Sequence, residues 1–238
     1  MRRVGILGGM GPEATVLLMQ KLLAAVPAAD DADHVPLIVD QNPQVPSRIR
    51  FLLERGGEDP GPVLAGMARR LEQAGAEALA MPCNTAHHFA PAIRAATRLP
   101  FLDMVALSVD RAARLAGKGG RVGILASPAV QKVALFEGPF AAAGLTPEYP
   151  EDQAALLAAI RRIKAEGPAE DARNTLRAAS RDLLARGAQV QMIACTEFSL
   201  IADSVAEGAQ VFDTLDVLVE AIREFAIGNS AKKRQAAG

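Results

Sequence analysis

The chain contains two cysteines, Cys83 and Cys195, which stand in similar surroundings. Each ends an apolar run and is followed by small polar residues, in "LAMPCNTA" (79–86) and "QMIACTEF" (191–198). A thiolate can remove a proton from carbon, and a thiol can return one. Two opposed cysteines could therefore invert a stereocentre by working on opposite faces of one substrate carbon. A matched pair suits a reversible reaction, because the two groups then exchange roles.

Other interpretations of the cysteines stay open at this point. Free cysteines are often small buried hydrophobic residues, and the two could also form a disulfide. Cys83, His87 and His88, together with Cys195, could form a zinc site, although Cys-x3-His-His is not a standard ligand spacing. In the simplest interpretation, His87 and His88 are exposed or cap the helix after Cys83.

A helical pattern follows each cysteine, so we expect both thiols to lie near helix N-termini. Backbone N–H groups at such ends stabilise anions. A helix N-terminus or a nearby cation lowers a thiol pKa and so favours the reactive thiolate.

The elements that must position these residues alternate along the chain. Buried strands are predicted at 2–8, 35–40, 77–81 and 100–103, with helices at about 13–26, 61–75 and 86–97. This alternation is typical of a parallel sheet covered by helices.

The pattern then begins again. Strand-like runs at 121–127, 146–149, 189–197 and 211–214 follow in the same order, and three pairs of positions correspond: Gly5 with Gly123, Cys83 with Cys195, and Asp103 with Asp213. The sequence therefore predicts a duplicated α/β unit with a repeat of about 110–118 residues. A helix at about 105–117 links the halves, so we expect them to pack closely.

The predicted fold is α/β, with two pseudo-symmetric domains that each hold a parallel sheet flanked by helices. We assign 1–103 plus 215–238 to the first domain and 104–214 to the second. Ligands bind beyond the carboxyl ends of parallel strands, and each cysteine follows the third strand of its half. The active site is therefore expected in the cleft between the domains. The end of the chain, from Asn229, has no apolar pattern and is expected to fray.

Composition limits the class of partner. The 238 residues carry a net charge of −1, which suggests neither nucleic acid nor an anionic membrane as a partner. No apolar stretch approaches the roughly 20 residues that span a bilayer. "MRRVGILGGM" (1–10) is interpreted as a first strand and not as a signal peptide. We therefore expect a cytoplasmic protein, with its cysteines reduced.

The first loop could also belong to a nucleotide-binding site. "GMGPEA" (9–14) fits G-x-G-x-x-A between a strand and a helix. However, Pro12 removes one N–H from the turn that would hold phosphate. Asp40 follows Gly11 by 29 residues, which is later than the usual spacing of about 20.

Three segments together resemble the cofactor-independent aspartate/glutamate racemase family: "GILGGMGPEAT" (5–15), "MPCNTAH" (81–87) and "ACTEF" (194–198). The resemblance extends over nearly the whole chain. "GGMGP" and "CTE" are most like the aspartate racemase branch. Membership implies two α/β domains, catalysis by two cysteines without pyridoxal phosphate or metal, and a homodimer.

The resemblance also implies roles for individual residues. Cys83 and Cys195 are the expected catalytic acid and base. Arg48 matches an arginine that binds the substrate's side-chain carboxylate, which a guanidinium can hold with two hydrogen bonds; Arg50 lies outside the matching position. Lys164 matches a lysine of the substrate pocket. Ala194 stands where the family often has glycine, which affects substrate fit.

The remaining expected substrate-binding residues border the two thiols. Asn84, Thr85 and Thr196 are short donors suited to an α-carboxylate. Glu197 stands where glutamate racemases have histidine, and it could orient or deprotonate Cys195 or cap the following helix. Met10 should border the cleft, shape the pocket and exclude water.

The sequence therefore predicts a racemase that interconverts L- and D-aspartate, with glutamate as an alternative substrate. Arg48 and Lys164 favour an acidic amino acid over a hydantoin. One alternative is a relative with the same fold and a different reaction: a hydantoin racemase, a maleate isomerase or a decarboxylase. Decarboxylating relatives typically keep one of the two cysteines. The other alternative is a noncatalytic small-molecule binding protein, which the lack of an export signal makes less favoured.

Overall fold

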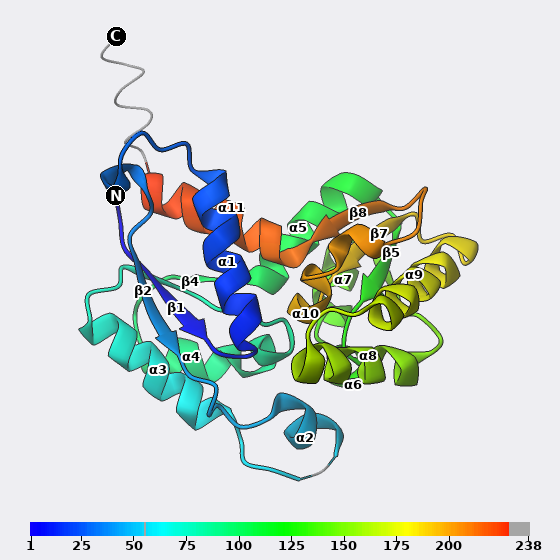
Figure 1. The fold of residues 1–238 in the computed structure, drawn as a ribbon, viewed down its shortest axis with the longest axis horizontal. Coiled ribbons are helices and arrows are strands. Elements are labelled where there is room, and N and C mark those ends of the chain that lie inside the picture. Colours follow the sequence, from blue (N-terminus) through cyan, green and yellow to red (C-terminus); the bar gives the residue numbers. More distant parts are fainter. Residues whose placement is uncertain (55, 229–238) are drawn as a thin grey trace.

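The apolar runs of both halves form strands, arranged as two four-stranded parallel sheets (Figure 1). The structure is a computed structural model that describes residues 1–54 and 56–228, so the segment from Asn229, expected to fray, lies outside the described residues. The first sheet has the order β2-β1-β3-β4 and the second has the order β6-β5-β7-β8. The strand bounds are β1 Val4–Gly8, β2 Leu37–Gln41, β3 Ala78–Ala80, β4 Phe101–Leu102, β5 Arg121–Leu125, β6 Thr146–Glu148, β7 Val190–Ile193 and β8 Gln210–Asp213.

The shared strand order confirms the internal repeat. The corresponding glycines of β1 and β5, Gly5 and Gly123, also pack in the same way. A Cβ on Gly5 of β1 would lie 3.0 Å from Leu79 Cδ2 and 3.1 Å from Leu71 Cβ. A Cβ on Gly123 of β5 would lie 2.7 Å from Leu183 Cδ1. In both halves the central strand approaches its covering helix so closely that only glycine fits.

Helices cover both sheets. The α-helices are α1 Pro12–Ala25, α2 Arg48–Leu53, α3 Gly61–Gln73, α4 Ala90–Ala96, α5 Met104–Ala116, α6 Pro128–Lys132, α7 Glu137–Ala142, α8 Gln153–Glu166, α9 Glu170–Ala185, α10 Thr196–Ser199 and α11 Thr214–Ile227. Short 3-10 helices occupy Asp31–Asp33, Thr85–Phe89 and Ala202–Ser204. The predicted helices at 13–26, 61–75 and 105–117 are confirmed, and the one at 86–97 begins as a 3-10 turn.

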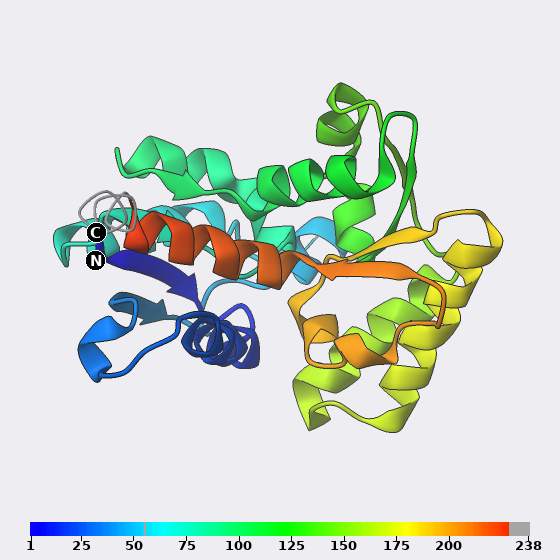
Figure 2. The same cartoon turned by 90° about the horizontal axis from the view of Figure 1, so that it is seen from above.

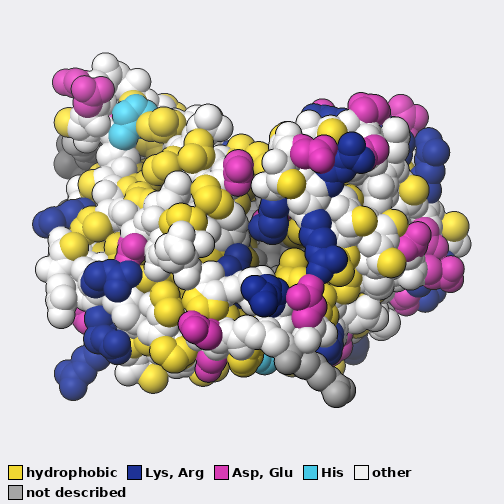
Figure 3. Space-filling view, turned by 60° about the horizontal axis from the view of Figure 1, so that its bottom comes forward, with side chains coloured by type: hydrophobic (Ala, Val, Ile, Leu, Met, Phe, Trp, Pro, Cys, Tyr) yellow, Lys and Arg dark blue, Asp and Glu magenta, His cyan; other side chains and the backbone are white. Residues whose placement is uncertain are grey.

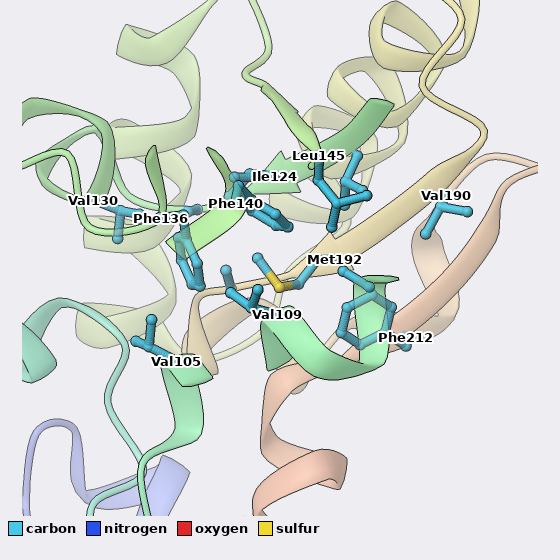
Figure 4. Close-up of a cluster of buried hydrophobic side chains, with 14 of the residues drawn as sticks. Val105, Val109, Ile124, Val130, Phe136, Phe140, Leu145, Val190, Met192 and Phe212 are labelled. Carbon is cyan, nitrogen blue, oxygen red and sulfur yellow. The ribbon is translucent and has the colours of Figure 1, made fainter. Parts of the chain in front are cut away.

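Two of these helices cross between the halves. α5 leaves the end of β4 and enters the core of the second half, where Val105 and Val109 join Ile124, Met192 and Phe212 (Figure 4). α11 leaves β8 and packs in the first half against α1. The two helices also pack against each other between the sheets (Figure 2). The two halves are therefore joined by two helices that pack against each other and run from one half into the other.

Both crossing helices start at an aspartate, as the repeat requires. The Asp103 side chain accepts hydrogen bonds from the backbone N–H groups of Val105 and Ala106. The Asp213 side chain accepts one from Leu215 N. An N-cap carboxylate satisfies N–H groups that the first helical turn leaves free.

The predicted fold class is therefore confirmed. The assignment of 1–103 plus 215–238 and of 104–214 to separate domains stays a prediction, as do the homodimer and the cytoplasmic location. No helix in the described ranges has both the length and the apolar character needed to cross a membrane.

Candidate active site

Cys83 and Cys195 line the same cavity, which lies between the two halves and has a volume of about 780 Å³. Cys83 follows β3 and Cys195 follows β7, so the thiols leave equivalent strands of the two sheets. Both thiols are free, and both residues are buried. The cavity therefore brings together two groups that are far apart in the chain, as the repeat predicted.

Most of the predicted site residues line this cavity. Those that do are Met10, Arg48, Cys83, Thr85, Lys164, Cys195 and Glu197. Lys and Arg side chains gather around the hollow between the lobes (Figure 3). The first half supplies Arg48 and Arg50, and the second supplies Arg161 and Lys164. A cavity with cations on both sides suits an anionic ligand.

Asn84 and Thr196 do not line the cavity. Asn84 has backbone angles in the right-handed helical region, and its Nδ2 donates a hydrogen bond of 2.9 Å to Thr214 Oγ1, away from the cavity. Thr196 is buried in the first turn of α10. Of the three short donors expected beside the thiols, Thr85 alone is among the cavity-lining residues.

Glu197 connects the second thiol to a cation. Cys195 Sγ donates a hydrogen bond of 3.0 Å to Glu197 Oε2. The other carboxylate oxygen, Oε1, forms an ion pair with Lys164 Nζ. Burial alone would lower the pKa of Lys164, but the Glu197 carboxylate and its hydrogen bond outweigh burial and raise that pKa. Lys164 is therefore a firmly charged ammonium group.

The electrostatics of Cys195 differ from the sequence expectation. We expected a helix N-terminus to lower the thiol pKa, but α10 has only 4 residues and contributes little. Burial and the Glu197 carboxylate hold the pKa of Cys195 well above its ordinary value, and Lys164 offsets only part of this. Cys195 is therefore a thiol at neutral pH, and so a proton donor.

Cys83 lies in a different local environment. The residues after it form a 3-10 helix, Thr85–Phe89, and not a regular α-helix. In the described part of the chain, no carboxylate accepts a hydrogen bond from Cys83 Sγ. The two thiols are thus equivalent in the fold but differ in their partners.

His87 has a structural role that the sequence interpretation missed. We expected it to be exposed or to cap a helix, but it is buried. Its Nδ1 lies 2.8 Å from Cys83 O, and its Nε2 accepts a hydrogen bond of 3.2 Å from Met104 N. Burial lowers the pKa of His87. As a neutral ring it ties the Cys83 loop to α5, and with both nitrogens engaged it is not free to bind the zinc ion considered above.

The loop after β1 does not form a phosphate site. The N–H of Gly9 donates to Thr15 Oγ1 over 3.0 Å, so it is already paired. Glu13 lies in the first turn of α1 and lines the cavity. Its carboxylate would repel a phosphate at that helix N-terminus.

Several cavity residues were missed by the sequence analysis. Arg161 lies three residues before Lys164 on α8, a spacing that places two side chains on one helix face and that could have identified it. Its guanidinium forms an ion pair of 2.5 Å with Glu54, which follows α2 in the first half. Ser127 occupies the repeat position of Gly9 and caps α6. No spacing or repeat position in the sequence marked Glu54 or Glu13 as a cavity residue.

Arg48 is held at the cavity by its own loop. Its Nη1 donates hydrogen bonds to Val45 O over 3.3 Å and to Pro46 O over 3.1 Å. Ser47 caps α2 by accepting from Arg50 N. The guanidinium keeps further N–H groups for another acceptor, because it has five in all.

The fold and the cavity define a class: a duplicated α/β protein with one thiol from each half in a cation-rich site between them. Comparison with known proteins gives the family. The Asp/Glu/hydantoin racemase profile matches residues 7–222, so the chain belongs to this family.

Relatives with solved structures share the fold. The chain is similar to the Picrophilus torridus aspartate racemase, with 27% identity, coverage of 95% of this chain and 94% of that one, and a TM-score of 0.85. An aspartate racemase homologue from Pyrococcus horikoshii OT3 has the same fold, with 22% identity, coverage of 96% and 100%, and a TM-score of 0.74.

A curated relative matches over a shorter region. The broad specificity amino-acid racemase RacX of Bacillus subtilis (strain 168) is 29% identical over 108 residues. The match spans 43% of this chain and 45% of that relative, which is less than half of its length.

Proposed function

We propose that the protein is an amino-acid racemase that interconverts L- and D-aspartate, with Cys83 and Cys195 acting on opposite faces of Cα. The observation that carries the proposal is the convergence of two thiols, from equivalent strands of the two sheets, on one cavity. Family membership and the likeness to the Picrophilus aspartate racemase support it.

The chemistry requires one base and one acid at any moment. A thiolate removes the Cα proton, and the opposed thiol donates a proton to the other face. Since Cys195 carries its proton in the free protein, it can serve as the acid whenever Cys83 is the base. The reverse reaction needs the opposite protonation states, and so the proton must move between turnovers.

Cations around the cavity favour a dicarboxylic amino acid over a hydantoin. Arg48 presents a guanidinium from α2, and Lys164 presents an ammonium from α8. We propose that these two bind the carboxylates of aspartate. Glutamate differs from aspartate by one methylene, so it belongs in the same test.

The proposal is tested by Cα–H exchange in D2O, followed by NMR, on L- and D-aspartate and then on both glutamates. Deuterium should enter aspartate as the opposite enantiomer accumulates. Cys83→Ser and Cys195→Ser should each lose inversion. Full racemisation by the Cys83→Ser/Cys195→Ser double variant would refute the two-thiol mechanism, and no exchange by the unmodified protein would refute the function.

A further inference from the structure

Three residues form a continuous chain from the cavity rim to a buried thiol. The Lys164 side chain is 34% exposed, while that of Glu197 is 11% exposed. Glu197 uses one oxygen for Lys164 Nζ and the other for Cys195 Sγ. A change at the rim ammonium group can therefore reach the thiol through a single carboxylate.

Other charged groups surround this chain. A Cβ on Gly11 would lie 3.3 Å from Glu13 Oε2, 3.6 Å from Lys164 Nζ and 3.7 Å from Glu197 Oε1. The first half therefore contributes Glu13 next to the pair. Cys83 and the rim arginines, Arg48 and Arg161, also line the cavity. Among these groups, Lys164 is the cation that the structure pairs directly with Glu197.

The paired state fixes where the proton resides. An ammonium group in contact with Glu197 stabilises the ionised carboxylate. The proton shared along the hydrogen bond therefore stays on Cys195 sulfur. In this state Cys195 can donate a proton but cannot remove one from a substrate carbon.

We infer that a substrate's side-chain carboxylate draws Lys164 away from Glu197, and that this exchange lets Glu197 take the Cys195 proton. The inference rests on the proposed racemase function. In the transfer, the S–H bond breaks, an O–H bond forms at Glu197 Oε2, and the electron pair stays on sulfur. The Cys195 thiolate can then remove the Cα proton. No other reactant is needed, and the net charge does not change.

The sign of the effect follows from the geometry. Lys164 contacts Glu197 directly, whereas it reaches Cys195 only across that carboxylate. Its departure therefore raises the proton affinity of the carboxylate more than that of the sulfur. Transfer from sulfur to oxygen becomes less costly. A dicarboxylic amino acid thus activates its own base, and an amino acid with a neutral side chain does not.

L- and D-asparagine test this coupling, because they have the shape of aspartate without the side-chain charge. With the unmodified protein, Lys164 stays with Glu197, and Cα–H exchange is slow for the enantiomer whose Cα–H faces Cys195. Lys164→Met removes the ammonium and keeps a side chain of similar length. We expect exchange of that enantiomer to rise about tenfold, which corresponds to a barrier lowered by about 1.4 kcal/mol. If Lys164 served only as a ligand for the substrate carboxylate, asparagine exchange would not change.

Two further variants complete the test. Glu197→Gln should abolish the rise in the Lys164→Met background, because glutamine cannot take the proton. Arg162→Met removes a cation of α8 that is not among the cavity-lining residues and that pairs with Glu166, and it should leave asparagine exchange as in the unmodified protein. Exchange rates in Lys164→Met that are no higher than in the unmodified protein for both enantiomers overturn the inference. If the unmodified protein still racemises aspartate, the proposed function survives that result; if it does not, the function itself fails.

Discussion

Asn84 and Thr214 are hydrogen-bonded across the two halves, from Asn84 Nδ2 to Thr214 Oγ1 over 2.9 Å. Thr214 Oγ1 in turn donates to Ile193 O over 3.0 Å. Asn84 follows Cys83 directly, and Ile193 ends β7 two residues before Cys195. One buried hydroxyl therefore connects the loops that hold the two thiols. This link gives Asn84 a structural task apart from the substrate contact expected for it.

Thr214→Val should destabilise the protein, because it leaves Asn84 Nδ2 and Ile193 O without their buried partner. We expect a loss of about 1–3 kcal/mol for such unpaired groups, measured by urea unfolding. Racemisation should slow as well, since the spacing of the two loops is no longer fixed. Thr214→Ser is the matched control, because it keeps the hydroxyl. Equal stability of the valine and serine variants would contradict this role.

Cys195 should react with iodoacetamide only at high pH. In a Cys83→Ser background, burial and the Glu197 carboxylate keep the pKa of Cys195 well above its ordinary value, so little thiolate exists at neutral pH. Glu197→Gln removes the negative charge and should move the alkylation midpoint to lower pH. Glu13→Gln, which removes a cavity carboxylate that does not bond Cys195, should move it less. A midpoint in Glu197→Gln at or above that of the parent would show that Glu197 does not control this thiol.

The sequence was sufficient to predict the features that repeat along one chain. Apolar runs that end in small polar residues marked β3 and β7, and hence placed Cys83 and Cys195 on one side of the fold. The correspondence of Gly5 with Gly123 predicted the duplication. These signals are local, and secondary structure responds mainly to local pattern.

The interactions between the halves were not predictable from the same signals. The side-chain direction of Asn84 depends on a 3-10 turn whose exact geometry no pattern specifies. The Arg161–Glu54 pair joins residues that approach only once both halves have packed. The neutral state of His87 and the raised pKa of Cys195 both follow from burial, which is a property of the assembled core.

Gly123→Ala should be strongly unfavourable. The added methyl would lie 2.7 Å from Leu183 Cδ1 and 3.1 Å from Gln191 Cγ, so the buried Leu183 side chain, β5 or α9 must shift. Overpacking of this kind costs about 1–3 kcal/mol, measured by urea unfolding. Gly138→Ala is the control, because nothing lies within 4 Å of its Cβ position in α7. Similar unfolding free energies for the two variants would argue against close packing at Gly123.

Asp213 should make the stability of the protein depend on pH. Its Oδ1 accepts hydrogen bonds from Ser199 Oγ and Leu215 N, while its buried Oδ2 has no hydrogen-bond partner in the described structure. Burial is the largest cause that raises the pKa of Asp213 to about 6. Because the unfolded pKa is about 3.9, the folded state holds this proton more tightly. The resulting stabilisation is complete below about pH 4 and is lost as the pH rises through about 6.

Asp213→Asn cannot ionise and keeps an acceptor for the α11 cap. From pH 4 to pH 7, its free energy of unfolding should therefore rise relative to the unmodified protein by about 2 kcal/mol, most of the effect of the full pKa difference. Urea unfolding at both pH values measures this change, and other acids cancel because both proteins share them. Asp203→Asn is the control, at an exposed carboxylate. The hydrogen bond from Arg173 is the largest cause that lowers the pKa of Asp203. This variant should therefore show no such rise between pH 4 and pH 7. A flat difference for Asp213→Asn as well would mean that Asp213 ionises as readily in the folded protein as in the unfolded chain.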